Sequence, residues 1–190
     1  MPSFDLRHIR AAEYHADGTY TGAVVVGDAM NVNLELRFAE GRLYAEGCLA
    51  EMLREAIGGT ASMGVKYIKA AAKTLMYGVV EKSRTVGNKT VKSELLTAKA
   101  EGKYVGFAFF APDMVDGERK YTAALVYRAK FGYPSLTYQT KGESINFNTP
   151  TTTGEFLPAA GENQELLEVV TLDTEAEAAA WVDAVVNYSE

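Results

Sequence analysis

Apolar and polar residues alternate over 32–38, with valine, leucine and phenylalanine at the even positions and asparagine, glutamate and arginine between them. A period of two is typical of a β-strand with one buried face. Residues 39–42 are expected to turn the chain after this strand. Upstream, the Asp-Gly pair between 6–14 and 20–26 predicts a hairpin of two further strands.

The later part of the chain continues this β-rich pattern. The segment 103–111 is rich in aromatic residues, and the turn-forming residues within 112–117 predict a reversal after it. Residues 121–131 then alternate, and we expect all their odd positions to share one face of a strand. Further strands are expected at 136–140, 144–148 and 151–157.

Two segments have helical character. Residues 68–79 consist largely of good helix formers. Thr174 and Glu177 have the spacing of a capping box, which predicts that a helix begins after Thr174. Apolar residues at helical spacing follow, so this helix is expected to run over about 175–188 and to dock on the sheet.

Two long segments lack the periodicity of a sheet. Residues 48–63 have no alternation, and residues 81–103 are polar and locally basic. We interpret 81–103 as a solvated loop or a long hairpin arm, and both segments are longer than ordinary connections. The chain is therefore expected to be a single domain, 1–190, of the α+β class with mainly antiparallel sheet.

Composition narrows the range of functions. The net charge of −6 disfavours binding to nucleic acid or to an anionic membrane. Cys48 is the only cysteine, which excludes an intrachain disulfide and a cysteine-rich metal site. We expect no secretory signal and no membrane span, since no run approaches ~18 apolar residues.

The residue types of common catalytic and cofactor sites are not grouped in this sequence. The only histidines, His8 and His15, are an odd number of residues apart on or beside one strand and have no nearby acidic cluster. The segment 87–90 lacks the glycines of a phosphate-binding loop. We therefore expect no catalytic residues, no metal and no cofactor, which leaves binding and assembly as the function rather than enzymatic activity.

One segment has a specific resemblance. Residues 133–151 read YPSLTYQTKGESINFNTPT. This stretch resembles the signature of siphophage major tail proteins, in which an aromatic or Phe-Ser-Glu-Pro-Ser lead precedes Tyr-x-Thr-Lys-Gly-Asp/Glu-x-Ile-x-Phe-x-Thr-Pro. The strand at 6–14, the Leu-Tyr-Ala-Glu step at 43–46, the strand near 104–110 and the acidic, Trp-containing terminal helix follow in the family's order.

The resemblance implies a tail-tube fold, a β-sandwich or barrel with a flanking helix and a C-terminal helix. Subunits of this family form hexameric rings that stack into the tube through which DNA leaves the virion. Its partners would be other copies of itself, the tape-measure protein, the tail terminator, and tail-initiation or distal tail proteins. DNA would pass without specific binding, no membrane would be involved, and the protein would be located in the virion, after assembly in the host cytoplasm.

Within that interpretation, polar strand faces are candidates for the tube lumen. The candidate residues are Asn33, Glu35, Ser144, Asn146 and Asn148, which alternate with apolar neighbours. An outer solvent-facing surface is the alternative for the same residues. The basic side chains Arg84, Lys89 and Lys92 are candidates for contacts between stacked rings.

Two other functions remain open from the sequence. The same subunit could form the inner tube of a contractile tail, a bacteriocin or an injection system, which a neighbouring sheath gene would reveal. A small β-rich module that binds carbohydrate or protein would instead be a monomer that retains a ligand, and the aromatic content of 11% is compatible with it.

Overall fold

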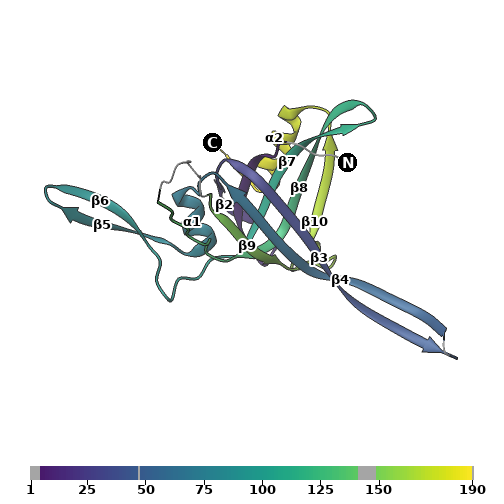
Figure 1. The fold of residues 1–190 in the computed structure, drawn as a ribbon. Helices are drawn as coiled ribbons and strands as arrows, with labels where there is room; N and C mark the ends of the chain where they lie inside the picture. Colours follow the sequence, from purple (N-terminus) through teal and green to yellow (C-terminus); the bar gives the residue numbers. More distant parts are fainter. Residues whose placement is uncertain (1–4, 47, 141–148, 190) are drawn as a thin grey trace.

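The computed structural model describes residues 5–46, 48–140 and 149–189. Figure 1 shows a central body of curved sheet and two helices, from which two long ribbons project in opposite directions. The elements in chain order are β1 (Arg7–Tyr14), β2 (Tyr20–Val25), β3 (Ala29–Ala45), β4 (Cys48–Val65), α1 (Ala70–Tyr77), β5 (Val80–Val86), β6 (Lys89–Leu95), β7 (Val105–Val115), β8 (Glu118–Phe131), β9 (Thr151–Phe156), β10 (Leu167–Leu172) and α2 (Glu175–Val185).

The main sheet is antiparallel throughout and has the strand order β2-β1-β7-β8-β9-β4-β3. Strand β8 pairs with β7 on one side and with β10 and then β9 on the other. The sheet is not closed into a barrel, and β5 and β6 form a separate ribbon. The α+β class with mainly antiparallel sheet, a flanking helix and a C-terminal helix is confirmed.

Each face of the sheet is covered by one hydrophobic core. The inner core contains alternate residues of most strands together with one side of α1, including Phe107, Phe156 and Met76. The outer core lies beneath α2, where Ala178 and Val182 pack on β7 and β8. Since both faces of the central strands are buried, β7 is apolar at almost every position.

A β-bulge in β8 corrects the expected pattern of its faces. The odd positions from Tyr121 to Tyr127 pack beneath α2, but Ala129 and Phe131 lie in the inner core. Between the pairs Val105↔Ala129 and Phe107↔Val126, β8 advances three residues while β7 advances two. The extra residue reverses which side chains face inward, so 121–131 does not keep one face.

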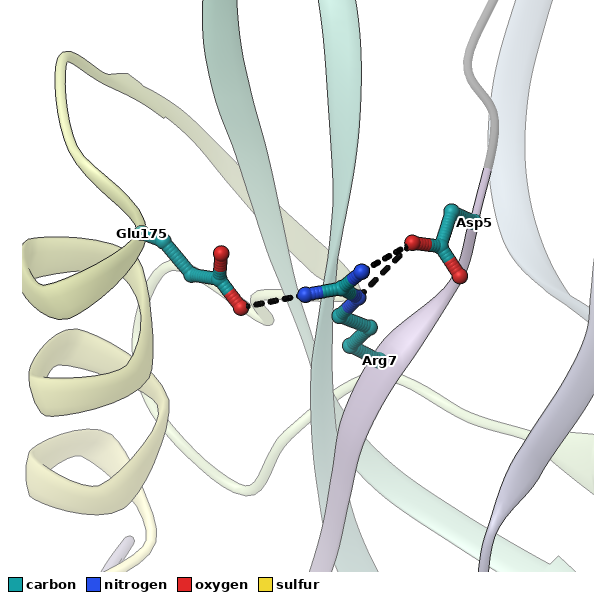
Figure 2. Close-up of polar contacts among 3 residues, drawn as sticks. All are labelled: Asp5, Arg7 and Glu175. Carbon is teal, nitrogen blue, oxygen red and sulfur yellow. Dashed lines mark hydrogen bonds and ion pairs between the residues drawn. The ribbon is translucent and has the colours of Figure 1, made fainter.

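The predicted capping box of α2 is present. Thr174 Oγ1 accepts a hydrogen bond from the Glu177 amide at 3.2 Å, and Glu177 Oε2 accepts one from the Thr174 amide at 3.0 Å. Figure 2 shows that Arg7, at the start of β1, lies between Asp5 and Glu175, the first residue of α2. Arg7 Nη1 donates to Glu175 Oε1 at 2.7 Å, which connects the helix N-terminus to the sheet.

The turns and ribbons differ from several predictions. Residues 39–42 do not turn, because β3 continues to Ala45, and residues 48–63 belong to β4. Of the two interpretations of 81–103, the hairpin arm is the one observed. Residues 112–113 remain in β7, and the reversal is made by Asp116 and Gly117, which both have positive φ.

Two of the later predicted strands also differ. Residues 136–140 have no strand, because they pair with no neighbour in the described chain, and 144–148 lie outside the described residues. The strands at 103–111, 121–131 and 151–157 are present, as are the first hairpin and both helices. Strand β10 was not predicted; it pairs with β8 over Tyr121–Val126.

The capping geometry leads to a stability prediction. Thr174→Ala removes the hydroxyl that accepts from the Glu177 amide, and we expect it to lower the free energy of unfolding by about 1 kcal/mol. Thr174→Ser keeps the acceptor and should retain most of the wild-type stability. Urea unfolding of the monomer followed by circular dichroism measures both. An alanine variant as stable as the serine variant would show that the box contributes nothing.

Candidate functional site

The described candidate lumen residues lie on one polar face formed by β3, β4 and β9. In the register, Asn33 pairs with Ser62 and Ser62 with Thr153. One step along, Glu35 pairs with Thr60 and Thr60 with Glu155. Directly paired residues of antiparallel strands point to the same side of the sheet, so these side chains form one continuous surface.

The opposite face of the same strands explains this orientation. Ala61, Met63 and Phe156 alternate with the polar residues and are fully buried in the inner core. Val32 and Leu34 pack against that core from β3. A strand buries its apolar side chains on one face only by presenting the alternate residues on the other, and this requirement fixes the polar surface.

The polar face carries one ion pair and one carboxylate, that of Glu35, without an ion-pair partner in the described chain. Asn33 Nδ2 donates to Glu35 Oε1 at 3.1 Å, and Arg37 lies 3.4 Å from Glu155 in an exposed ion pair. Lys130, which is opposite Glu155 in the register, donates instead to Glu101 at 2.8 Å. The surface therefore presents mainly hydroxyl and amide groups and no excess of positive charge.

Sequence reasoning identified only part of this surface. Asn33 and Glu35 are exposed on it, while Ser144, Asn146 and Asn148 lie outside the described residues. The sequence did not indicate that β4 and β9 also contribute to this surface, with residues such as Ser62 and Thr153. The odd positions of β9 carry the polar side chains, but Thr152 at a buried even position blurs the alternation.

The β5–β6 ribbon carries the candidate ring-stacking residues, and its register separates them. Arg84 pairs with Val91 and Val86 with Lys89, so Arg84 and Lys89 are on one face. Lys92 pairs with Ser83 on the other face and makes an ion pair with Glu81 at 2.9 Å. All three candidates are exposed, but only Arg84 and Lys89 belong to a common surface.

The second ribbon is the outer part of the β3–β4 hairpin, residues 36–46 and 48–58, which we call the β3–β4 arm. Strand β9 pairs with β4 only from Gly59 to Gly64, so the arm extends beyond the sheet. Every described residue of the arm except Gly58 is exposed. The large apolar side chains among them are Leu36, Phe38, Leu43, Tyr44, Leu49, Met52, Leu53 and Ile57, exposed by 39–64%.

The main sheet also has unpaired edges. In the described part of the chain, β2 and β3 each have one side without a partner strand, and so does β10.

Cys48, next to the end of the arm, is exposed rather than packed. Within the described residues no group of three His, Cys, Asp or Glu side chains could hold a metal ion, and no helix is long and apolar enough to span a membrane.

Comparison with known proteins gives no relative from which a function could be taken. No protein-family model matches the chain, and a search of curated proteins finds no similar sequence. The surfaces themselves, a polar sheet face, two exposed ribbons and open sheet edges, are therefore the basis for a functional proposal.

The register that builds the polar face can be tested by disulfide trapping. Directly paired residues have Cα atoms about 4.5–5.5 Å apart, within the range of a disulfide. In a Cys48→Ser background, Asn33→Cys with Ser62→Cys should form an intrachain disulfide on mild oxidation, measured by mass spectrometry. Asn33→Cys with Ala61→Cys places the thiols on opposite faces and should not. Equal trapping of both pairs would contradict the register.

Proposed function

We propose that the chain is the major tail protein of a long-tailed bacteriophage with a non-contractile tail. Copies form stacked rings, hexameric by the resemblance, whose central channel conducts DNA during genome delivery. The observation that carries this proposal is the β3–β4 arm, whose apolar side chains have no cover within the described chain. The resemblance of 133–151 to the signature of tail proteins supports the same function.

The arm is unsuited to an isolated subunit. A two-stranded hairpin without a third strand or a packed face is marginally stable in water. Contiguous exposed apolar surface in a soluble protein usually marks an interaction site. The arm has such residues on both faces, for example Phe38 and Leu53. Contact with other subunits would bury these side chains and stabilise the ribbon.

The open edges of the sheet support closure between subunits. An unpaired edge offers backbone donors and acceptors to another chain. A head-to-tail contact that closes on itself produces a ring, and a second contact on the faces of the ring produces a tube. Strands β2 and β3, at opposite ends of the strand order, are suitable for such a head-to-tail contact.

The polar face on β3, β4 and β9 is the proposed lumen. Duplex DNA carries one charge per ~1.7 Å of its axis, so a cationic channel would hold it. The polar face instead carries hydroxyls, amides, the Arg37–Glu155 ion pair and the Glu35 carboxylate, on a subunit with a net charge of −6. Such a surface allows DNA to pass. The tape-measure protein would occupy the channel before DNA, and terminator and initiation proteins would bind the tube ends.

Electron microscopy and sedimentation of the purified protein test this function. We expect rings or tubes that increase with protein concentration, since subunits must meet to cover the arm. Tyr44→Ser with Leu49→Ser, a cross-strand pair near the end of the arm, should raise the concentration required by roughly tenfold or more.

Leu96→Ser with Met114→Ser is the matched control, because these side chains are similarly exposed but lie outside both ribbons. It should assemble like the wild type. A wild-type protein that stays a monomer at all concentrations, including with tape-measure and initiation proteins, would overturn the proposal.

A further inference from the structure

The β5–β6 ribbon has two chemically different faces. One face, which we call the basic face, carries Lys82, Arg84, Val86, Lys89 and Val91. Val86 and Val91 are exposed by 65% and 47%, and none of the three cations has an ion-pair partner in the described chain. This face therefore combines uncovered apolar surface with uncompensated positive charge.

The other face of the ribbon is already neutralised. Lys92 pairs with Glu81 at 2.9 Å, and Lys73 of α1 reaches Glu94 at 2.6 Å. Its remaining members are small hydroxyl residues such as Ser83. Because the charges on this face are already in ion pairs, a charged partner has no free charge to bind there. Any docking of this ribbon should therefore use the basic face.

The β3–β4 arm also has two chemically different faces, and one of them carries unpaired negative charge. Ala39 pairs with Glu55, Gly41 with Leu53, and Leu43 with Glu51, and together these residues form what we call the acidic face. Leu43 and Leu53 are exposed by 58% and 64%. Among the described residues neither Glu51 nor Glu55 has an ion-pair partner.

Within its described residues, the arm's other face carries no unpaired negative charge. Glu40 lies 3.3 Å from both Arg42 and Arg54, and the Arg54 guanidinium lies 4.0 Å above the Phe38 ring. That face has one positive charge in excess, so the acidic face is the side of the arm on which glutamates have no ion-pair partner in the described chain. Both unmatched faces are strips along two-stranded ribbons, with leucines facing outward on one and valines on the other.

The two faces cannot meet within one subunit, because the ribbons project from opposite sides of the body (Figure 1). We propose that the basic face of the β5–β6 ribbon docks on the acidic face of the β3–β4 arm of another copy. The leucines and valines exclude water from the contact, and the opposite charges set its orientation. The contact is head-to-tail, so each copy donates one ribbon and receives another.

This inference rests on the proposed self-assembly and specifies which surfaces make one of its contacts. It divides the predicted stacking residues, since Arg84 and Lys89 take part and Lys92 does not. Because the charges are partly exposed, association through this contact should weaken as salt increases.

A charge-swap experiment on the full chain tests the docking. Arg84→Glu with Lys89→Glu places like charges opposite each other in every contact, and so does Glu51→Lys with Glu55→Lys. Each pair should slow assembly, followed by light scattering and electron microscopy, by roughly tenfold or more. The four substitutions combined restore opposite charges and should return assembly to within about twofold of the wild type.

Lys69→Glu with Lys99→Glu is the control for net charge, because both lysines are exposed and lie outside the ribbons. Circular dichroism of each monomer verifies that the body is folded. If the wild type assembles while the reversals behave like this control, or if the combined variant is not rescued, the docking is wrong and the tube function stands. A wild type that never associates overturns both.

Discussion

The backbone pairing of β3 with β4 is continuous from the hydrophobic core to the end of an exposed arm. Near Met63 the ladder has one face in the inner core, but beyond Gly58 neither face is covered. Backbone hydrogen bonds alone stabilise such a ribbon only marginally. The requirement to cover this arm is the constraint on which the proposed assembly depends.

The rest of the fold positions the arms and the polar face relative to this ladder. Helix α2 covers the outer face of β7 and β8, and α1 covers part of the inner core. With both central faces buried, the surfaces left for other molecules include the sheet edges, the polar face around Ser62 and the ribbons. The edges and the ribbons each have a physical reason to contact another copy.

The sequence predicted those elements whose signal is local or whose strands have one buried face. The α2 capping box needs only Thr174 and Glu177, and the strand containing Asn33 has a core on one side. Within 48–63 the sequence failed to predict the strand over 48–58, because a ribbon with two exposed faces has no reason to alternate. The sequence also did not predict the bulge of β8 near Tyr127. A bulge exists only relative to the paired strand, here β7, which has one residue fewer between the same two paired positions.

For the candidate surfaces too, the sequence predicted single strands but not which strands lie beside them. Alternation identified Asn33 and Glu35 but not their neighbours on β4 and β9, since cross-strand register is a long-range property. The basic composition of 81–103 identified Arg84 and Lys89, but only the hairpin register separates them from Lys92. Which strand faces form one surface is decided by pairing partners, and these are distant in the sequence.

Hydrogen exchange of the two ribbons, compared between monomer and assembly, tests the central claim most directly. Their amides lack covering structure in the subunit, so they should exchange much faster than those of β7 in the monomer. In the assembled state we predict strong protection of the β3–β4 arm and the β5–β6 ribbon. Ribbons that exchange equally fast in monomer and assembly would contradict the claim that other copies cover them.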